Sequence, residues 1–278
     1  MKASILLLRV GMAVCLFLSF ATGRTADRAQ GVPFKDGVEV HINGQGPFQF
    51  GLDTGASLAF WINPELAKQL DLPVTSHGHA HASNDAEASP VDVLRIDDLE
   101  LAGHSFHHVI GVSFSQSGDG TLGMELFKDV SVTLDYPGDR LSISDESLPV
   151  ADRKHIFDYT DDSTTPAFSV DLDGVPVNAR LDTGAAGTGS DIMVPLKLAS
   201  KLHLTAPMQP SGIVQDAMGH GYKRYTATLD GDLTIGELTV HRPTLLISEA
   251  PYVYLGGICN RLVITLDHRH HRVELEFP

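Results

Sequence analysis

The chain contains 278 residues, of which 35 are acidic and 20 are basic, and its formal net charge is −15 at neutral pH. Such an acidic chain lacks the excess of lysine and arginine with which proteins bind nucleic-acid phosphates, so we expect no nucleic-acid partner. The length allows either one large domain or two smaller ones, each with an adequate hydrophobic core.

The N-terminal residues have the pattern of a secretory signal peptide. Lys2 and Arg9 accompany an apolar stretch, and small residues come after it. The apolar stretch is too short to span a membrane. We therefore expect a signal peptide over residues 1–21, with cleavage after Ala21 or Gly23. The mature protein is then expected to be periplasmic or secreted, without a membrane anchor.

The two cysteines are Cys15 and Cys259. Cys15 lies inside the apolar stretch behind Val14, whereas a lipid-modified cysteine follows a small residue, so cleavage without lipid attachment is favoured. Cleavage then leaves Cys259 alone, and no intrachain disulfide can form. We expect packing, rather than disulfides, to stabilise the exported chain.

A hairpin followed by a polar turn occurs twice. Residues 51–57 read GLDTGAS and residues 180–188 read RLDTGAAGT, so Asp-Thr-Gly-Ala recurs after 129 positions. Each copy comes after two strand-like segments joined by a tight turn, which Asn43 or Asp173 opens before a glycine. These dipeptides favour hairpin turns because the central residues need a positive φ. One Asp-Thr-Gly is an ordinary turn, but two copies behind matching hairpins indicate a duplicated unit.

The similarity between the two copies extends downstream of the turns. Asn63 is expected to cap a short helix that begins at Pro64, and Pro195 takes the corresponding place in the second copy. Further landmarks recur in the same order, namely Gly103 and Gly236 after one strand and Asp135 and Asp267 at the end of another. The repeats predict lobes over residues 27–147 and 166–278, joined by a polar linker over residues 148–165.

With these motifs, the chain resembles the retropepsin-like aspartic peptidases, in the tandem form found in exported bacterial proteins, and more distantly the two-lobed pepsins. The resemblance rests on the two Asp-Thr-Gly-Ala segments, which begin at Asp53 and Asp182, and covers nearly all of the mature chain. It implies an all-β fold of two homologous β-barrel lobes, related by a pseudo-twofold axis, with a short helix in each.

The resemblance implies that Asp53 and Asp182 are paired catalytic carboxylates of an aspartic endopeptidase. Two carboxyls about 3 Å apart cannot both ionise cheaply, so they share one proton and can activate a water molecule between them; the aspartic-protease pair is the standard example of that rule. The supporting residues implied for the two turns are Thr54, Gly55, Thr183 and Gly184. A polypeptide substrate, no metal or cofactor, and a monomer that holds the complete site are expected.

In this family an apolar-apolar-Gly segment passes behind each catalytic turn. The first lobe contains it as Thr121-Leu122-Gly123. The second lobe offers two alternatives, Tyr254-Leu255-Gly256 or the segment 257–260, which has Cys259 in the place of the glycine. A buried cysteine without a partner histidine or aspartate pattern favours packing over chemistry.

The resemblance also implies a flap, a hairpin between the helix and the next strands that covers the bound peptide. Two glycine-bearing polar segments are candidates, residues 76–84 and 217–225. Within them, the candidate flap residues are His77, Gly78, His79, Gly219, His220, Gly221 and Tyr222.

Two other functions compete with hydrolysis by an aspartate pair. The histidines at residues 77, 79 and 81 and those within 268–272 are of a type that binds Zn²⁺ or Cu²⁺, but no carboxylate or cysteine pattern completes a site, so solvated loop histidines are favoured. A catalytically silent, chaperone-like protein of the same fold could instead bind an extended peptide by strand addition. Retention of both aspartates and both threonines favours the peptidase, because a binder does not need two carboxylates that repel each other.

Overall fold

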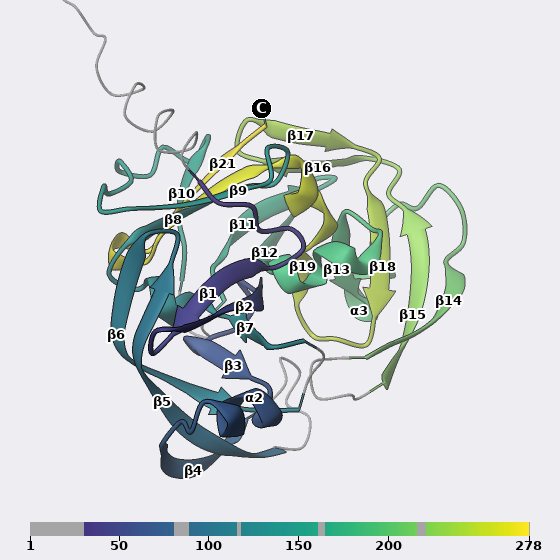
Figure 1. Cartoon of the computed structure of the whole chain (residues 1–278). Coiled ribbons are helices and arrows are strands. Elements are labelled where there is room, and N and C mark those ends of the chain that lie inside the picture. The colour runs from purple at the N-terminus through teal and green to yellow at the C-terminus, as the bar shows by residue number, and fades with distance from the viewer. Residues whose placement is uncertain (1–30, 81–88, 116–117, 161–164, 216–220, 278) are drawn as a thin grey trace, which may run out of the picture.

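The computed structural model describes residues 31–80, 89–115, 118–160, 165–215 and 221–277 (Figure 1). The expected signal peptide lies outside these residues. Within them, the fold is mostly β, and two lobes share a third sheet. No helix in the described ranges is long and apolar enough to cross a membrane.

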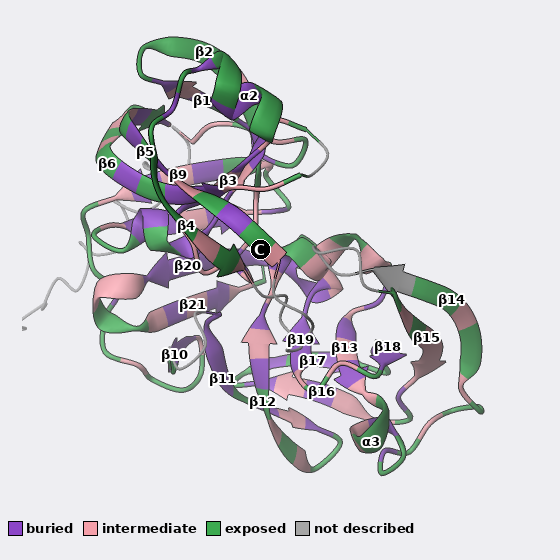
Figure 2. Ribbon diagram, turned by 90° about the horizontal axis from the view of Figure 1, so that it is seen from below, coloured by how far each residue is buried: buried purple, intermediate pink, exposed green. Residues whose placement is uncertain are grey.

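The first lobe is a closed sheet of seven strands in the order β1-β2-β7-β3-β6-β5-β4, and an additional pairing between β1 and β5 closes the barrel. The strands are β1 (Val38–Ile42), β2 (Gln45–Leu52), β3 (Phe60–Ile62), β4 (Val74–Ala80), β5 (Ser89–Leu101), β6 (His104–Ser113) and β7 (Gly120–Leu122). Helix α2 (Pro64–Gln69) and the 3₁₀ helix η1 (Met124–Phe127) complete it. Buried and exposed residues alternate along β5 (Figure 2), as expected for a barrel strand.

The second lobe repeats this order in its nine-stranded sheet. Its strands are β11 (Ala167–Leu172), β12 (Val175–Leu181), β13 (Ile192–Pro195), β14 (Gln209–Gln215), β15 (Gly221–Thr228), β16 (Asp232–Ile235), β17 (Leu238–His241), β18 (Thr244–Ser248) and β19 (Val253–Leu255). The helices are η2 (Thr183–Thr188), α3 (Leu196–Ala199) and η3 (Gly257–Arg261). The order β11-β12-β19-β13-β18-β15-β14 matches the order of the strands in the first lobe. The long strands β5 and β6 of the first lobe each correspond to two strands here: β15 and β16 correspond to β5, and β17 and β18 correspond to β6.

The third sheet joins the lobes. It consists of β8 (Ser131–Asp135), β9 (Arg140–Ser144), β10 (Ile156–Asp158), β20 (Val263–Asp267) and β21 (Arg272–Glu276), in the order β10-β21-β20-β8-β9, with the 3₁₀ helix η4 (His268–His270) between β20 and β21. Strands β8 and β20 are equivalent in the repeat and pair antiparallel, with Thr133 opposite Thr265. The hydroxyls of these two threonines are 2.9 Å apart. The pseudo-twofold axis therefore passes between them.

Several local predictions are confirmed. Asn43 and Asp173 have φ values of 50° and 52°, and each is followed by a glycine of positive φ in the hairpin turn. The Asn63 side chain accepts a hydrogen bond from the N–H of Glu65 at the start of α2. The all-β architecture of two homologous barrel lobes is confirmed as well.

Two details differ from the sequence-based expectations. Pro195 ends β13, and α3 begins one residue later at Leu196, because Pro195 keeps an extended backbone with ψ of 143°. The polar segment between the lobes contains β10, which pairs with β21 of the shared sheet. Its apolar residues Ile156 and Phe157 are buried, so this part of the expected linker contributes to the core.

The shared sheet is expected to contribute strongly to stability. Ile264 is fully buried in β20, opposite Leu134 of β8. Ile264→Ala should therefore lower the free energy of unfolding by about 2–5 kcal/mol, through lost burial and the cavity left behind. Chemical denaturation measures this loss. The matched control Ile213→Ala, at a side chain that is 68% exposed, should change stability by less than about 0.5 kcal/mol, and equal effects would contradict the assignment.

Candidate active site

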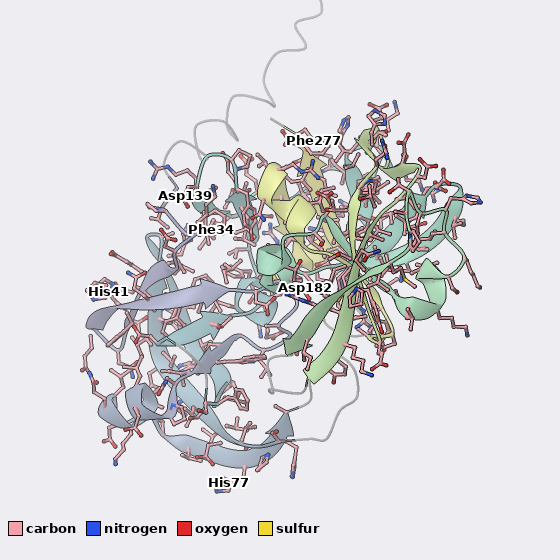
Figure 3. The ribbon with its side chains drawn as sticks, turned by 90° about the vertical axis from the view of Figure 1, so that its right-hand side faces the viewer. Phe34, His41, His77, Asp139, Asp182 and Phe277 are labelled. Carbon is pink, nitrogen blue, oxygen red and sulfur yellow. The ribbon has the colours of Figure 1, made fainter. Side chains whose placement is uncertain are left out.

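The two Asp-Thr-Gly turns lie at the ends of equivalent strands, β2 and β12, where the lobes meet. The N–H of Asp53 donates to the Leu122 carbonyl at 3.0 Å, and the N–H of Asp182 donates to the Leu255 carbonyl at 3.1 Å. Strands β7 and β19 run parallel to β2 and β12 and hold the turns from behind. In Figure 3, Asp182 lies between the two lobes.

The structure decides between the two alternatives for the second-lobe segment. Because Leu255 takes the place of Leu122, the equivalent of Gly123 is Gly256, and Cys259 lies three residues beyond it. A Cβ on Gly256 would approach the Ala185 carbonyl oxygen to 2.7 Å, so the close passage of the turn explains the glycine. The thiol of Cys259 is buried and donates to the Leu255 carbonyl at 3.2 Å, and burial raises its pKa. These contacts agree with a packing role.

The two turns exchange hydrogen bonds through their threonines. The N–H of Thr54 donates to Thr183 Oγ1 at 3.0 Å, and the N–H of Thr183 donates to Thr54 Oγ1 at 2.9 Å. The Thr54 hydroxyl then donates to the Leu181 carbonyl at 2.7 Å. Both threonines are buried. This cross-brace fixes each turn against the opposite lobe.

The two carboxyls are brought together by the same backbone. Asp53 Oδ1 accepts hydrogen bonds from the N–H of Gly55 at 2.7 Å and, across the lobes, from the N–H of Gly184 at 3.2 Å. Asp182 Oδ1 accepts from the N–H of Ala185 at 3.1 Å. Asp53 and Asp182 therefore approach each other from the two lobes. Two neighbouring carboxyls of this kind favour one proton between them, because ionisation of both is unfavourable.

The glycines of the turns are required by this close approach. A Cβ on Gly184 would lie 2.7 Å from the carboxyl oxygens of Asp53, and a Cβ on Gly55 would lie 2.9 Å from the Asp182 carboxyl and 3.0 Å from Asp53 Oδ1. Both carboxyls therefore come within about 3 Å of one point beside Gly55. Any larger residue would push the pair apart.

The surroundings favour retention of a proton by this pair. Loss of hydration raises the pKa of Asp53, although the N–H groups of Gly55 and Gly184 oppose this shift. Loss of hydration also raises the pKa of Asp182, and the negative charge of Asp53 raises it further. The proton belongs to the pair, so the acid and base roles are not divided between the two residues.

A family model described as aspartyl protease matches the chain twice, over residues 38–126 and 168–266. The chain belongs to the aspartyl protease family. The two matched regions each contain one Asp-Thr-Gly turn, so the family assignment covers both lobes of the tandem arrangement. A comparison with curated proteins finds no match.

Two residues near the aspartyl protease turns were not identified from the sequence. Burial raises the pKa of the Tyr136 phenol, and the neighbouring side chain of Thr183, in the opposite lobe, opposes this shift. Thr165 Oγ1 donates to the Gly55 carbonyl at 3.2 Å. The available signal for Tyr136 was its position directly after Asp135, one of the repeated landmarks. Its contact with the opposite lobe has no signature in the sequence.

The candidate flap residues lie in two equivalent hairpins. His77, Gly78 and His79 belong to β4, which pairs with β5. Gly221 and Tyr222 begin β15, which pairs with β14. In Figure 2 these two hairpins point toward each other. Gly219 and His220 lie outside the described residues, and a covering role for either hairpin stays a prediction.

Two of the candidate histidines each lie beside an aspartate. His77 Nδ1 lies 2.7 Å from Asp92 on the neighbouring strand, and His270 Nδ1 lies 3.0 Å from Asp267. In the described part of the chain, no three His, Cys, Asp or Glu side chains are placed so that they could hold a metal ion. His81 lies outside that part.

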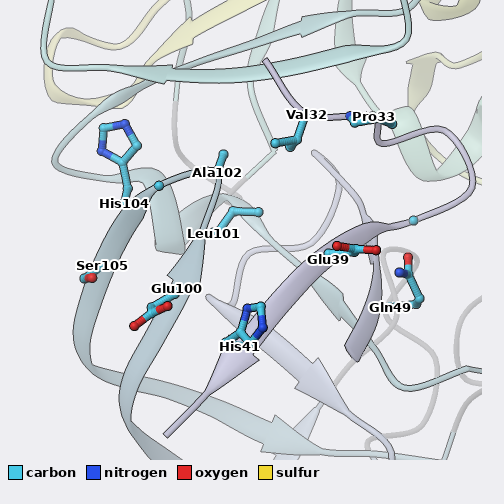
Figure 4. Close-up of a pocket in the computed structure, with 12 residues that line it drawn as sticks. Val32, Pro33, Glu39, His41, Gln49, Glu100, Leu101, Ala102, His104 and Ser105 are labelled. Atoms are coloured by element: carbon cyan, nitrogen blue, oxygen red, sulfur yellow. The ribbon is translucent and has the colours of Figure 1, made fainter. Parts of the chain in front are cut away.

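A hollow of about 860 Å³ lies on the first lobe, apart from the aspartate pair (Figure 4). It is lined by residues of the segment 31–37, β1 and the β5–β6 turn, among them Glu39, His41, Glu100 and His104. None of its lining residues belongs to the Asp-Thr-Gly turns. The hollow is therefore separate from the aspartate pair.

The cross-brace generates a stability prediction. Thr54→Val keeps the shape of the side chain but leaves the buried N–H of Thr183 without an acceptor, which should lower the free energy of unfolding by about 1–3 kcal/mol. Thr54→Ser restores the hydroxyl and should recover most of this loss. Urea denaturation of both variants makes the comparison, and equal losses for valine and serine would show that the hydroxyl is dispensable.

The raised pKa values generate a prediction with a defined sign. The folded protein holds a proton on the pair at pH values where the unfolded chain has released it, so the pair lowers stability increasingly as the pH rises above the ordinary Asp value of 3.8. Asp182→Asn removes this penalty. The unfolding free energy of the variant minus that of the parent should therefore become more positive from about pH 4 to neutral pH.

The control for this experiment is Asp152, whose pKa shifts in the opposite direction. Backbone N–H groups, led by that of Ile156, lower the pKa of Asp152 to about 2. Its contribution to stability is present above the ordinary pKa and is lost as the pH falls through the folded value. Asp152→Asn should thus be less stable than the parent at neutral pH, and the difference should shrink between about pH 4 and pH 2. If the stability differences of the two variants changed with pH in the same direction, at least one of the two assigned pKa shifts would be wrong.

Proposed function

We propose that this chain is an aspartic endopeptidase that hydrolyses peptide bonds with a water molecule activated between Asp53 and Asp182. One observation carries the proposal, namely that the two carboxyls approach the same point beside Gly55 in a site built from both lobes. The family to which the chain belongs supports the same reaction class.

The reaction needs one proton on the pair. The ionised carboxyl takes a proton from the bound water, and the neutral carboxyl donates a hydrogen bond to the carbonyl oxygen of the substrate. The water oxygen forms a bond to the carbonyl carbon, and the tetrahedral intermediate then releases the amine as its nitrogen receives a proton and the C–N bond breaks. The raised pKa of the pair keeps the required proton in place.

The substrate is proposed to be a polypeptide in extended conformation that crosses the aspartate pair. One chain supplies both aspartates and both threonines, which supports action as a monomer. The proposed place of action is the periplasm or the exterior of the cell, and the signal-peptide pattern of residues 1–21 supports it.

The test is digestion of an unfolded protein mixture by the parent, Asp53→Asn and Asp182→Asn across acidic to neutral pH. Each variant should lower kcat/KM by at least about 100-fold, because it removes a group that transfers protons in the reaction. Asp36→Asn, at an exposed position of the first lobe, is the control and should cleave like the parent.

Two outcomes would overturn this mechanism. Near-normal cleavage by either dyad variant would mean that the two aspartates do not form one site. Binding of labelled peptides without turnover by the parent and both variants would instead identify a silent peptide-binding protein of the same fold.

A further inference from the structure

An arginine stacks on a tyrosine close to the aspartate pair. The guanidinium carbon of Arg180 lies 3.3 Å from the centroid of the Tyr252 ring, a cation–π contact. Arg180 is in β12, two residues before Asp182. The neighbouring side chains Ala179 and Leu181 are buried in the lobe core. Because side chains alternate along a strand, Arg180 faces the same side as Asp182, about 7 Å along the chain.

Two tyrosines extend this contact into a surface. Arg180 is the register partner of Tyr254 across the parallel pair β12 and β19. The rings of Tyr252 and Tyr254 meet edge to face, with centroids 6.3 Å apart. Tyr252 is half-buried and Tyr254 is buried, so the guanidinium rests on a fixed aromatic base. We call these three residues the Arg180 wall.

The positive charge of the Arg180 wall is not neutralised by the described part of the protein. Arg95, Arg261 and Arg269 each pair with an aspartate. Among the described residues, the guanidinium of Arg180 has no carboxylate partner and donates no hydrogen bond. Stacking uses the face of the guanidinium and leaves its N–H edge available. In a chain of net charge −15, such an arginine is suited to an incoming anion.

The first lobe has no counterpart to this wall. The position equivalent to Arg180 is Gly51, whose register partner Thr121 stands in the place of Tyr254. The position equivalent to Tyr252 is Asp119, whose carboxylate accepts a hydrogen bond from the N–H of Gln49 at 2.9 Å. The two sides of the aspartate pair therefore differ in both charge and bulk, although the turns themselves match.

We infer that the Arg180 wall binds an acidic side chain of the polypeptide substrate, on the side of the scissile bond that lies against the second lobe. This inference rests on the proposed peptidase function and specifies its substrate class. The guanidinium edge fits a carboxylate with two parallel hydrogen bonds, which are stronger than bonds between neutral groups. The first lobe, with Asp119 and without an arginine at this position, gives no such preference.

The experiment uses pairs of fluorogenic peptides that differ only by Glu or Gln at one position flanking a bond that the parent cleaves. The assays are run near pH 6, where the glutamate side chain is ionised. The parent should show a kcat/KM for Glu that is about tenfold higher than for Gln on one flank of the bond only. Arg180→Met should bring this ratio close to one, because it should lower kcat/KM for the Glu peptide and leave kcat/KM for the Gln peptide unchanged.

Two further variants complete the design. Arg180→Lys keeps the charge but loses the planar pair of donors, so it should retain part of the preference. Lys201→Met removes one exposed positive charge that is not part of the wall and should retain all of the preference. A parent that cleaves Glu and Gln peptides equally, or a ratio that Arg180→Met does not change, overturns the inference.

Binding measurements separate this inference from the proposed function. Fluorescence polarisation of labelled peptides that differ only by Glu or Gln is recorded with the parent, Asp182→Asn and Arg180→Met. Tighter binding of the Glu peptide that depends on Arg180, without cleavage by the parent, upholds the Arg180 wall and overturns the peptidase. Equal cleavage of the Glu and Gln peptides upholds the peptidase and overturns the proposed role of the Arg180 wall.

Discussion

The reciprocal hydrogen bonds between Thr54 and Thr183 are the constraint on which the site depends. Each threonine uses its backbone N–H and its hydroxyl to bind the opposite turn, so neither turn reaches its position without the other lobe. The carboxyls of Asp53 and Asp182 then meet in a place where hydration is reduced and ionisation of both is unfavourable. The backbone N–H groups and hydroxyls of the two threonines, which carry no charge, thereby hold together two carboxyls that repel each other when both are ionised.

The symmetry of this bracing does not extend to its surroundings. Tyr136 of the first half neighbours Thr183, whereas the equivalent position in the second half is His268, whose ring lies 2.6 Å from the Tyr159 hydroxyl. The Arg180 wall likewise has only Gly51 and Thr121 opposite it. The backbone around the pair is thus duplicated, and the side chains that flank it are specific to each half.

The sequence predicted those features that local chemistry determines. Asn43 and Asp173 indicate their turns because few other residues tolerate positive φ there, and the repeat itself revealed the two lobes. The contacts of Tyr136 and the stacking of Arg180 on Tyr252 could not be predicted, because they join residues distant in the chain whose approach depends on how strands pair. The choice of Gly256 over Cys259 also required the strand register, since both fitted the pattern.

The pairing of β8 with β20 has an implication for the origin of the tandem chain. These strands are copies of one another and run antiparallel about Thr133 and Thr265, so the edge that each presents is complementary to itself. A protein containing only one repeat could associate with a second identical molecule along that edge. Fusion of two such subunits would preserve the contact while freeing each half to acquire its own mutations, which is the pattern that the residues beside the aspartates display.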